Sequence, residues 1–351
     1  MKKFLFSLLA FLLLFTALGQ IPAHYYAAAE GKQNTELKEA LSAIISEGYV
    51  QRTYGDLWTD FVTTDTRSDG FVWDIYSNCD FTFGVDQDRG GNAPDECYFY
   101  NREHSVPNSW FGVQSQSPMY TDLFHLYPTD KYVNAERANF PYGETNNPTK
   151  TYVNGSKKGP GAPASGYTST VFEPTDEFKG DLARTYFYMA TRYLNINFAQ
   201  KDGGMVMFTY SNSTCDLSEY SNDLLLKWHR EDPVSDKETA RNNAIYGIQH
   251  NRNPFIDYPE LVEHIWGNLK DVAWSGLAVS DLPAKPSIII TRQDEGIRIE
   301  GAAPDTEVEI YSIMGQKVYS ALADRVFISL NHLQKGVYLI KIGEYVEKMV
   351  W

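Results

Sequence analysis

The sequence predicts an α+β region in which helices predominate, followed by a small all-β sandwich. Three observations lead to this prediction. With 351 residues, the chain is long enough for two domains. Between about residues 30 and 267, apolar residues recur at helical spacing in several segments, and short β-rich stretches lie among them. After residue 286 the pattern changes to short β runs separated by turn residues.

The N-terminus carries the pattern of a secretory signal peptide over residues 1–19. Met1–Lys3 is basic, and the apolar run Phe4–Leu18 that follows is too short to span a bilayer comfortably. Small residues precede Gln20, and a second cleavage candidate lies at 27–29. No cysteine follows the run, so a lipoprotein anchor is not expected. We expect an exported protein with no stable membrane insertion.

Helices and strands of the larger region follow from local patterns. Leucine and isoleucine recur at helical spacing from Thr35, and Gly48 is a typical helix stop. A capping box begins at Ser235. The expected helices are 35–48, 180–194, 221–230, 235 to 249 or 250, and one from between 257 and 259 to 267. The expected strands are 71–83 and 205–210, and a long surface loop is expected over 141–167.

After an expected linker at 268–285, turn residues separate six short β runs. The spacing of these runs predicts a small β-sandwich over 286–351. The expected strands are 287–291, 296–300, 307–311, 317–320, 326–329 and 337–342.

Three cysteines are present, and export permits disulfides. Cys79 and Cys97 would close a short loop just ahead of Glu103, so we expect these two to pair and Cys215 to be left over. No Cys-x-x-Cys motif is present, which argues against a structural zinc site built of thiolates.

The formal net charge of −14 argues against broad, nonspecific attraction to nucleic acid. A local basic groove is still compatible with this charge, although scattered solvated charges are the simpler interpretation. The cations available to line such a groove are Lys131, Arg137, Lys150, Lys157, Lys158, Arg184, Arg192, Arg241 and Arg252.

The most informative stretch contains Glu103 and His104, with Asn134 about thirty residues later at an expected helix start. Water attacks a phosphodiester slowly unless a base removes its proton, and the pKa of free histidine lies near neutrality. A carboxylate and an amide oxygen, completed by water and a phosphate oxygen, suit Mg²⁺. The simpler alternatives are a structural histidine, a salt bridge from Glu103 to Arg102 or Arg137, and a helix cap at Asn134. The pattern favours a nuclease.

From about Tyr25 to Trp266 the chain resembles the bacterial endonuclease I family, through several motifs in order. These motifs are NREHSVPNSWF (101–111), DLFHLYP (122–128), YVN (132–134), GDLAR (180–184), WH (228–229), DPV (232–234) and QHNRNPFID (249–257). The resemblance implies a catalytic domain over 20–267 with a ββα-metal (His-Me finger) core. It also implies a secreted or periplasmic enzyme.

The resemblance implies roles for three residues. His104 would be the general base, and Glu103 and Asn134 would hold one divalent cation. We expect Mg²⁺, with Ca²⁺ or Mn²⁺ as alternatives. The expected reaction is sequence-nonspecific hydrolysis of DNA, and of RNA as a second substrate, to 5′-phosphorylated fragments.

Two departures from the family pattern bear on activity. Phe124 stands where members commonly have a histidine in the motif at 122–126, and we interpret it as a core position. No counterpart of the Gly-Gly-Arg segment with which some members hold phosphate is evident. We therefore take Arg137 as catalytic with His104, and Arg102, Arg241 and Arg252 as substrate-binding candidates.

Arg241 and Arg252 fall on or near one polar face of the helix expected after Ser235 and its extension. That face can grip phosphate or form a buried network that supports the site, and we favour the buried network. Trp228 and His229 are interpreted as core. Base stacking on Trp110 or Phe111, which are expected to be exposed, is a further hypothesis.

The segments IYSIMGQKV (310–318) and LQKGVYLIKI (333–342) resemble C-terminal sorting domains of the type IX secretion system. This resemblance implies a Bacteroidetes-type bacterium, recognition by outer-membrane secretion machinery, passage through the periplasm, and removal of the domain on export. The product would be secreted or held at the cell surface. An ordinary carbohydrate- or surface-binding sandwich is the alternative.

Two other functions remain open from the sequence. One is a zinc hydrolase that uses His104, His125 and His229, although no His-x-x-x-His helix supports it. The other is a secreted nucleic-acid-binding or surface protein that keeps the nuclease scaffold but has lost turnover, an idea supported by Phe124 and the acidic balance.

Overall fold

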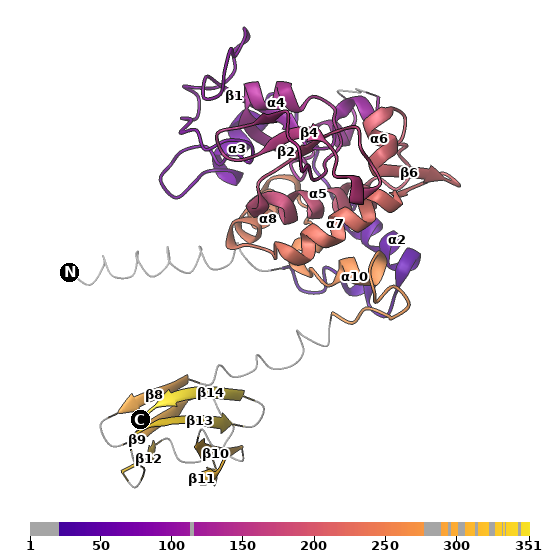
Figure 1. The fold of residues 1–351 in the computed structure, drawn as a ribbon. Coiled ribbons are helices and arrows are strands. Elements are labelled where there is room, and N and C mark those ends of the chain that lie inside the picture. Colours follow the sequence, from indigo (N-terminus) through magenta and orange to yellow (C-terminus); the bar gives the residue numbers. More distant parts are fainter. Residues whose placement is uncertain are drawn as a thin grey trace, which may run out of the picture. The chain divides into compact units, whose positions relative to one another are not determined.

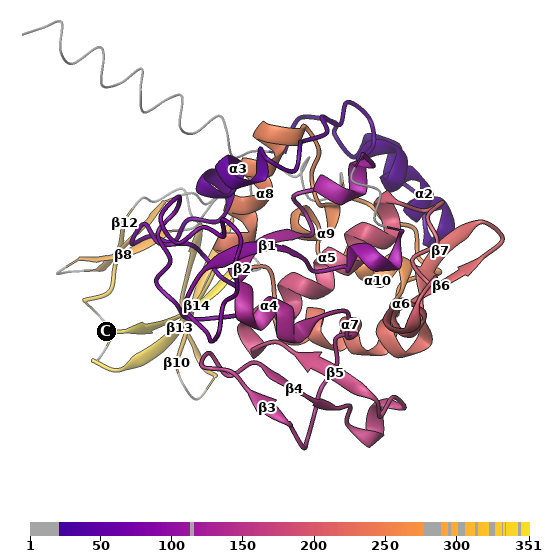
Figure 2. The same ribbon diagram turned by 90° about the horizontal axis from the view of Figure 1, so that it is seen from above.

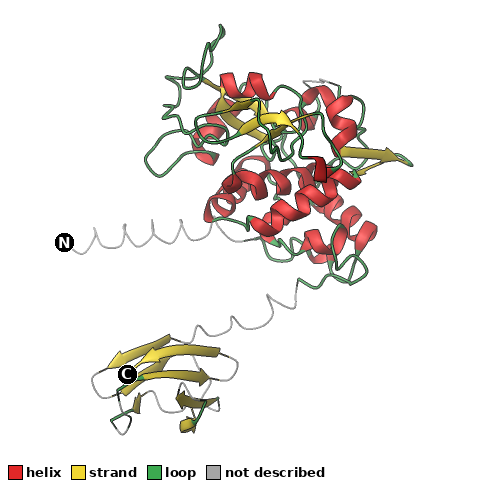
Figure 3. Cartoon of the chain, viewed as in Figure 1, coloured by secondary structure: helices red, strands yellow, loops and turns green. Residues whose placement is uncertain are grey.

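A computed structural model describes residues 21–112 and 116–276, and in the C-terminal part residues 289–293, 296–300, 306–312, 315–322, 327–331, 333, 335–342 and 345–351. The chain divides into two compact units, Met1–Ser275 and Gly276–Trp351 (Figure 1). The larger unit mixes helices and short sheets and the smaller is all-β, which confirms the predicted α+β class (Figure 3). The expected signal peptide at 1–19 lies outside the described residues.

In the described residues, the larger unit has ten helical elements up to α6 and four from α7 onward, interleaved with small antiparallel sheets.

 Within the described residues, the last four, counted from α7 itself, are α7 (Glu219–Glu231), α8 (Asp236–Gln249), α9 (Pro254–Asp257) and α10 (Leu261–Ile265). The earlier ones are η1 (Ala27–Ala29), α2 (Asn34–Ile44), α3 (Leu57–Thr64), η2 (Asn108–Trp110), η3 (Pro118–Thr121), α4 (Lys131–Arg137), η4 (Pro163–Ser165), η5 (Asp176–Phe178), α5 (Lys179–Arg192) and α6 (Asp202–Met207).

Helix α5 is the centre of the larger core. Thirteen of its fourteen residues are buried, from Lys179 to Thr191, so the helix is surrounded on every side rather than on one stripe. Its polar side chains are satisfied by partners from distant segments. The Tyr186 hydroxyl, for example, donates to the Ser105 carbonyl at 2.9 Å. The helix therefore supports the segment that follows Glu103 and His104.

Strand β1 (Tyr100–His104) pairs with strand β2 (Leu126–Asp130), and β2 leads directly into α4. The three elements lie side by side in Figures 1 and 2. The strands are antiparallel, with Glu103 opposite Tyr127 and His104 opposite Leu126. Asp130 ends β2 and caps α4, because its side chain accepts from the backbone N–H groups of Tyr132 and Val133. The cap fixes where the helix leaves the sheet.

The other sheets of the larger unit are also antiparallel. One has the order β3 (Lys150–Thr151), β4 (Lys157–Pro160), β5 (Thr170–Glu173), and the other pairs β6 (Phe208–Ser211) with β7 (Thr214–Leu217). The loop expected over 141–167 is therefore only partly loop, since β3, β4 and η4 lie within it. Residues 205–207, expected as strand, belong to α6. Both errors arise because pairing and packing with distant residues override local composition.

Residues 71–83 form no regular strand, contrary to expectation. Their β-like composition reflects burial, since Val72, Ile75 and Tyr76 are fully buried. The Asp74 carboxylate accepts from the Tyr76 N–H at 2.7 Å and from the Asp130 N–H at 2.7 Å. Such side-chain bonds to the backbone replace a strand ladder.

The predicted helices agree with the structure more closely than the predicted strands of the larger unit do. The helices expected at 35–48, 180–194 and 235–249 correspond to α2, α5 and α8, and the capping box at Ser235 is present. The helix expected from Ser221 starts at Glu219 with Ser218 as its cap. The last expected helix is divided into α9 and α10.

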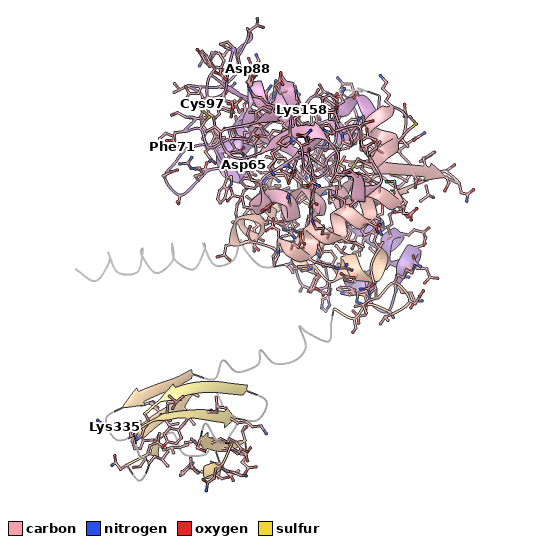
Figure 4. All side chains as sticks on the ribbon, viewed as in Figure 1. Asp65, Phe71, Asp88, Cys97, Lys158 and Lys335 are labelled. Carbon is pink, nitrogen blue, oxygen red and sulfur yellow. A yellow bond between two sulfur atoms is a disulfide. The ribbon has the colours of Figure 1, made fainter. Side chains whose placement is uncertain are left out.

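A disulfide joins Cys79 to Cys97, which confirms the predicted pair; Cys215 is buried and unpaired (Figure 4, where Cys97 is labelled). The disulfide lies beside the cap of α4, because the Cys97 N–H donates to the Asp130 carboxylate at 2.6 Å. One covalent link thus holds the loop that contributes to the start of α4.

The smaller unit contains two antiparallel sheets with the orders β11-β10-β13-β14 and β12-β9-β8. Their strands are β8 (Ile289–Gln293), β9 (Gly296–Glu300), β10 (Glu307–Ser312), β11 (Lys317–Leu322), β12 (Phe327–Ser329), β13 (Val337–Ile342) and β14 (Tyr345–Val350). Isoleucines from both sheets, including Ile297 and Ile340, share one core. The six expected strands are present within a few residues, and β14 was not expected.

Residues 268–275 form the first part of the expected linker 268–285. Trp274 is 2% exposed and exchanges backbone hydrogen bonds with Gly31 and Lys32 at 2.9 and 2.8 Å. Residues 268–275 therefore pack with the larger unit, while 277–285 lie outside the described residues.

Reduction of the Cys79–Cys97 disulfide is expected to lower the free energy of unfolding by about 3 kcal/mol, because a loop of this length then regains its freedom in the unfolded chain. Urea unfolding with and without reductant measures the change. The double variant Cys79→Ala, Cys97→Ala is the control, and its stability should not respond to reductant. An equal response in both proteins would contradict the assignment.

Candidate active site

Two faces of β1 carry different parts of the candidate site. Successive side chains of a strand point to opposite faces, so Asn101 and Glu103 share one face while Arg102 and His104 share the other. The contacts agree with this alternation. Helix α4 bonds to Asn101 and Glu103, whereas aromatic rings contact Arg102 and His104. The side chains of Glu103 and His104 are thus adjacent in sequence but lie on opposite faces of the strand.

On the first face, Glu103 is 3% exposed and its Oε1 accepts from the Tyr76 hydroxyl and from Arg137 Nη1, both at 3.0 Å. Burial raises the pKa of Glu103 to about 7, against the opposing effect of Arg137. Both bonds fall on Oε1. Within the described residues Oε2 has no hydrogen-bond partner.

Arg137 joins α4 to the end of β1. It is 1% exposed, and besides Glu103 it donates to the His104 carbonyl at 3.2 Å and the Ser105 carbonyl at 2.7 Å. Burial opposes its charge, but Tyr142, Tyr76 and Glu103 outweigh that effect and raise the pKa of Arg137 above its ordinary value. So deeply buried a guanidinium acts as a support for the site, which differs from the direct catalytic role expected.

Asn134 lies one turn before Arg137 on the same side of α4, in mid-helix rather than at its start. Its Nδ2 donates to Asn101 Oδ1 at 2.8 Å, which fixes the orientation of the amide. Within the described part of the chain, Asn134 Oδ1 has no hydrogen-bond partner. Since Asn101 and Glu103 share a face, this carbonyl oxygen lies on the same side of β1 as Glu103.

These two oxygens fit a hard divalent cation. A carboxylate Oε2 and an amide Oδ1, both without hydrogen-bond partners in the described residues and both held by bonds on their other atom, are typical ligands of Mg²⁺ and Ca²⁺. In the described residues, no imidazole or thiolate, the ligands that transition metals favour, hydrogen-bonds to the side chains of Glu103 or Asn134.

On the second face, His104 Nε2 lies 2.9 Å from the Tyr120 carbonyl oxygen. A carbonyl only accepts, so Nε2 carries the proton and Nδ1 holds the lone pair. Burial, with His125 second, lowers the pKa of His104 to about 3, so the ring is neutral over the physiological range. Tyr54 stacks on the ring and Tyr120 flanks it, at centroid distances of 5.9 and 4.7 Å. His104 is 7% exposed, so only an edge is accessible.

The three substrate-binding candidates lie in different surroundings. Arg102 is half-buried, with its guanidinium over the rings of Tyr54 and Trp58, beside His104. Arg241 and Arg252 are buried at 6% and 2% exposure and pair with Asp65 (labelled in Figure 4) and Asp257. These two belong to the buried network favoured from the sequence, so their burial and ion pairs argue against substrate binding. Arg102 stays a candidate.

Other cations expected for a basic groove are mostly neutralised. Lys150 lies over the rings of Tyr132 and Tyr152, and Arg192 donates to Ser46. The remaining ones form ion pairs: Lys131–Asp88, Lys157–Glu173, Lys158–Glu136, Arg137–Glu103 and Arg184–Glu238. Trp110 and Phe111 are 1% and 6% exposed, so the expectation of an exposed pair was wrong.

Phe124 is buried against Tyr188, with ring centroids 4.6 Å apart, as expected of a core position. His125 is fully buried and its Nε2 donates to the Met119 carbonyl at 2.5 Å. His229 contacts Arg184 and Phe187 instead. Within the described residues, the cluster of possible metal ligands is Cys79, Cys97 and Asp130, whose sulfurs form the disulfide. The three histidines therefore do not form the zinc site considered from the sequence.

Comparison with known proteins places this site in a family. The family model described as Endonuclease I matches residues 33–260, which include Glu103, His104, Asn134 and Arg137. The chain belongs to the endonuclease I family. It is an endonuclease, and members of this family generally use a divalent metal ion.

Relatives of this endonuclease include secreted nucleases. It is 36% identical over 248 residues to an extracellular ribonuclease of Bacillus subtilis, covering 69% of this chain and 78% of the relative. It is 30% identical over 136 residues to Endonuclease-1 of Buchnera aphidicola, covering 39% and 44%. It is 27% identical over 171 residues to an extracellular deoxyribonuclease of Aeromonas hydrophila, covering 44% and 64%.

A second family model, the secretion system C-terminal sorting domain, matches residues 283–350 of the endonuclease. This match shows that the β-rich unit is a sorting domain rather than a carbohydrate-binding sandwich. The endonuclease is secreted or displayed at the cell surface. Among the residues that the structure describes, no helix has the length and apolarity needed to cross a membrane.

A shell of tyrosines surrounds the site of the endonuclease and is not evident from the sequence. Tyr76 and Tyr142 share a 2.5 Å hydrogen bond beside Glu103, while Tyr54 and Tyr120 flank His104. The chain has 24 tyrosines, so composition alone could not single these out. Only their long-range contacts do.

Substituting Arg137 by Gln is expected to lower the free energy of unfolding by about 3–5 kcal/mol, because Glu103 and two carbonyls lose their buried partner. Arg230→Gln, which removes the exposed ion pair with Glu263, should cost less than about 1 kcal/mol. Urea unfolding compares the two. Similar losses would show that Arg137 does not support the site.

Proposed function

We propose that this endonuclease hydrolyses phosphodiester bonds of DNA and RNA without sequence preference, with His104 as general base and one Mg²⁺ held by Glu103 and Asn134. In this proposal β1, β2 and α4 are the ββα-metal (His-Me finger) core of the enzyme. The hydrogen bond from His104 Nε2 to the Tyr120 carbonyl is the observation that carries the proposal.

That bond gives His104 the tautomer that a base requires. With the proton on Nε2, Nδ1 can accept a proton from a water molecule as its oxygen attacks phosphorus. The low pKa keeps the ring neutral at neutral pH, so the lone pair on Nδ1 is not already protonated. Tyr54 and Tyr120 restrict rotation of the ring and keep Nδ1 in place.

Glu103 and Asn134 would hold the cation on the other face of β1. When bound, a divalent cation supplies positive charge that stabilises the five-coordinate phosphorus and the leaving 3′ oxygen. Arg137 keeps Glu103 in position through Oε1 and so leaves Oε2 available. Breaking the P–O3′ bond leaves the phosphate on the 5′ side, so 5′-phosphorylated fragments are the expected products.

The relatives support a broad substrate range. One of the relatives compared above is named a ribonuclease and another a deoxyribonuclease, and the family model spans the site in this chain. With a net charge of −14 and most nearby cations ion-paired, the enzyme is expected to bind polynucleotides weakly and to depend on the metal and on Arg102 for phosphate contacts.

We further propose that the protein consists of a signal peptide at 1–19, a catalytic domain starting at residue 20, and a sorting domain at 286–351. The type IX secretion machinery would recognise the sorting domain at the outer membrane and remove it on export. The match over 283–350 and the separate core of this unit support the proposal.

The alternative of a scaffold without turnover loses its main support. Phe124 lies in the core against Tyr188, as a packing residue. A histidine missing at that position therefore removes none of the three groups that the proposed chemistry needs.

His104→Ala is expected to lower the rate of plasmid cleavage by at least about 100-fold, because a general base contributes this much or more. A matched control is His250→Asn, which changes an exposed histidine at a left-handed C-cap that asparagine tolerates. Gel assays give the rates, and circular dichroism checks folding. Cleavage by folded His104→Ala at the rate of the control would refute the role of His104.

Asn134→Ala is expected to raise the Mg²⁺ concentration for half-maximal cleavage more than about tenfold, since it removes a metal ligand. Glu136→Gln, on the same helix but bonded to Lys158, is the matched control and should behave like the wild type. Titration of chelator-treated enzyme with Mg²⁺ measures both. An unchanged Mg²⁺ requirement in Asn134→Ala would exclude Asn134 as a ligand.

A further inference from the structure

A cavity of about 410 Å³ opens beyond the C-terminal end of α4. Its walls include Ser109, Trp110, Asn139, Phe140, Tyr167 and Lys201, which come from the segments after β1 and α4, from the loop before β5, and from the start of α6. The proposed chemistry does not use this cavity.

The cavity lies close to the candidate metal ligand. Ala138, which also lines it, follows Asn134 by four residues, and its N–H donates to the Asn134 carbonyl at 3.0 Å. Four residues of helix rise about 6 Å along the axis, so Ala138 lies about one turn beyond Asn134. A polynucleotide bound at Asn134 through one phosphate would therefore bring its neighbouring nucleotide to the cavity.

The cavity walls carry aromatic, polar and positively charged side chains, which can bind the base, the sugar and the phosphate of a nucleotide. Tyr167 and Phe140 are half-buried aromatic rings, and every base offers a flat face for stacking on such rings. Asn139 can bond to base edges or sugar hydroxyls, and exposed Lys201 adds a positive charge that suits phosphate. Ser109 Oγ is buried without a hydrogen-bond partner in the described residues, so it can bond to a ligand.

The backbone around the cavity is held in an unusual form. Ala138 has φ +49° and ψ −127°, a conformation that residues with a side chain rarely adopt. On the opposite wall a Cβ at Gly203 would lie 2.5 Å from the Asn139 carbonyl oxygen and 2.7 Å from Trp110. The close approach of these segments, together with a strained residue, gives the cavity its shape.

We propose that this cavity binds the nucleoside next to the cleaved phosphodiester, in a single-stranded segment of the substrate. A base within a duplex is stacked and paired, so a cavity entered from the side takes a base that has left the stack. Tyr167 stacks on the base, Asn139 and Ser109 bond to its edge or sugar, and Lys201 contacts a phosphate. This inference rests on the proposed function, because it places the cleaved bond at Asn134.

The test compares two single-stranded pentanucleotides with the same phosphates, one of thymidines and one of abasic residues, in the presence of chelator so that neither is cleaved. Wild-type enzyme is expected to bind the thymidine strand about tenfold more tightly, as expected for stacking of a base. Calorimetry measures both affinities. In Tyr167→Ala this ratio should fall to near one, while binding of the abasic strand stays unchanged.

Two variants serve as controls. Tyr98→Ala removes a 52% exposed tyrosine ahead of β1, at the other end of α4, and should keep the tenfold ratio. Lys201→Gln should weaken both strands equally and leave the ratio unchanged. A ratio in Tyr167→Ala equal to that of the wild type would overturn the inference, as would a wild-type ratio of one.

Plasmid cleavage by the same wild-type preparation, with Mg²⁺ added, separates this inference from the proposed function. Cleavage with an unchanged ratio in Tyr167→Ala refutes the nucleoside site alone. Absence of cleavage refutes the proposed function, and with it the place of the cavity in the reaction.

Discussion

The arrangement of the site depends on one buried guanidinium. Arg137 reaches from the last residue of α4 to the carboxylate of Glu103 and to the carbonyls of His104 and Ser105, at distances of 2.7 to 3.2 Å. A charge buried to 1% exposure is stable only with such partners. Because Arg137 needs these partners, it holds α4 against β1. This contact fixes the position of Asn134 relative to Glu103.

The alternation of side chains along β1 gives neighbouring residues two different environments. Because consecutive residues of β1 face opposite ways, Glu103 meets a helix with polar side chains while His104 meets tyrosine rings and a carbonyl. Burial favours the neutral form of both groups, so it raises the pKa of the Glu103 carboxyl group and lowers that of the His104 imidazole. The candidate base and the candidate cation-binding oxygens therefore lie in different surroundings on one short strand.

The Cys79–Cys97 disulfide, a bond that suits an exported protein, also supports this site. Asp130 caps α4 and accepts a bond from the backbone of Cys97, whose disulfide with Cys79 ties the preceding loop. An exported enzyme can rely on such a link because the surroundings are oxidising. The acidic balance of the chain, with most cations near the site already paired, leaves phosphate attraction to a few local groups.

By itself the sequence determined the class of the protein, the long helices, the β-rich C-terminal unit and the Cys79–Cys97 pair, since periodicity, capping signals and turn residues act over a few positions. The motifs around Glu103, His104 and Asn134 pointed to a nuclease family. Only the tertiary structure decided which arginines are exposed, because Arg241 and Arg252 find their carboxylates through long-range packing. It also decided that residues 71–83 form no strand and that His104 and Glu103 face opposite ways, since non-local contacts, which local pattern does not record, set both.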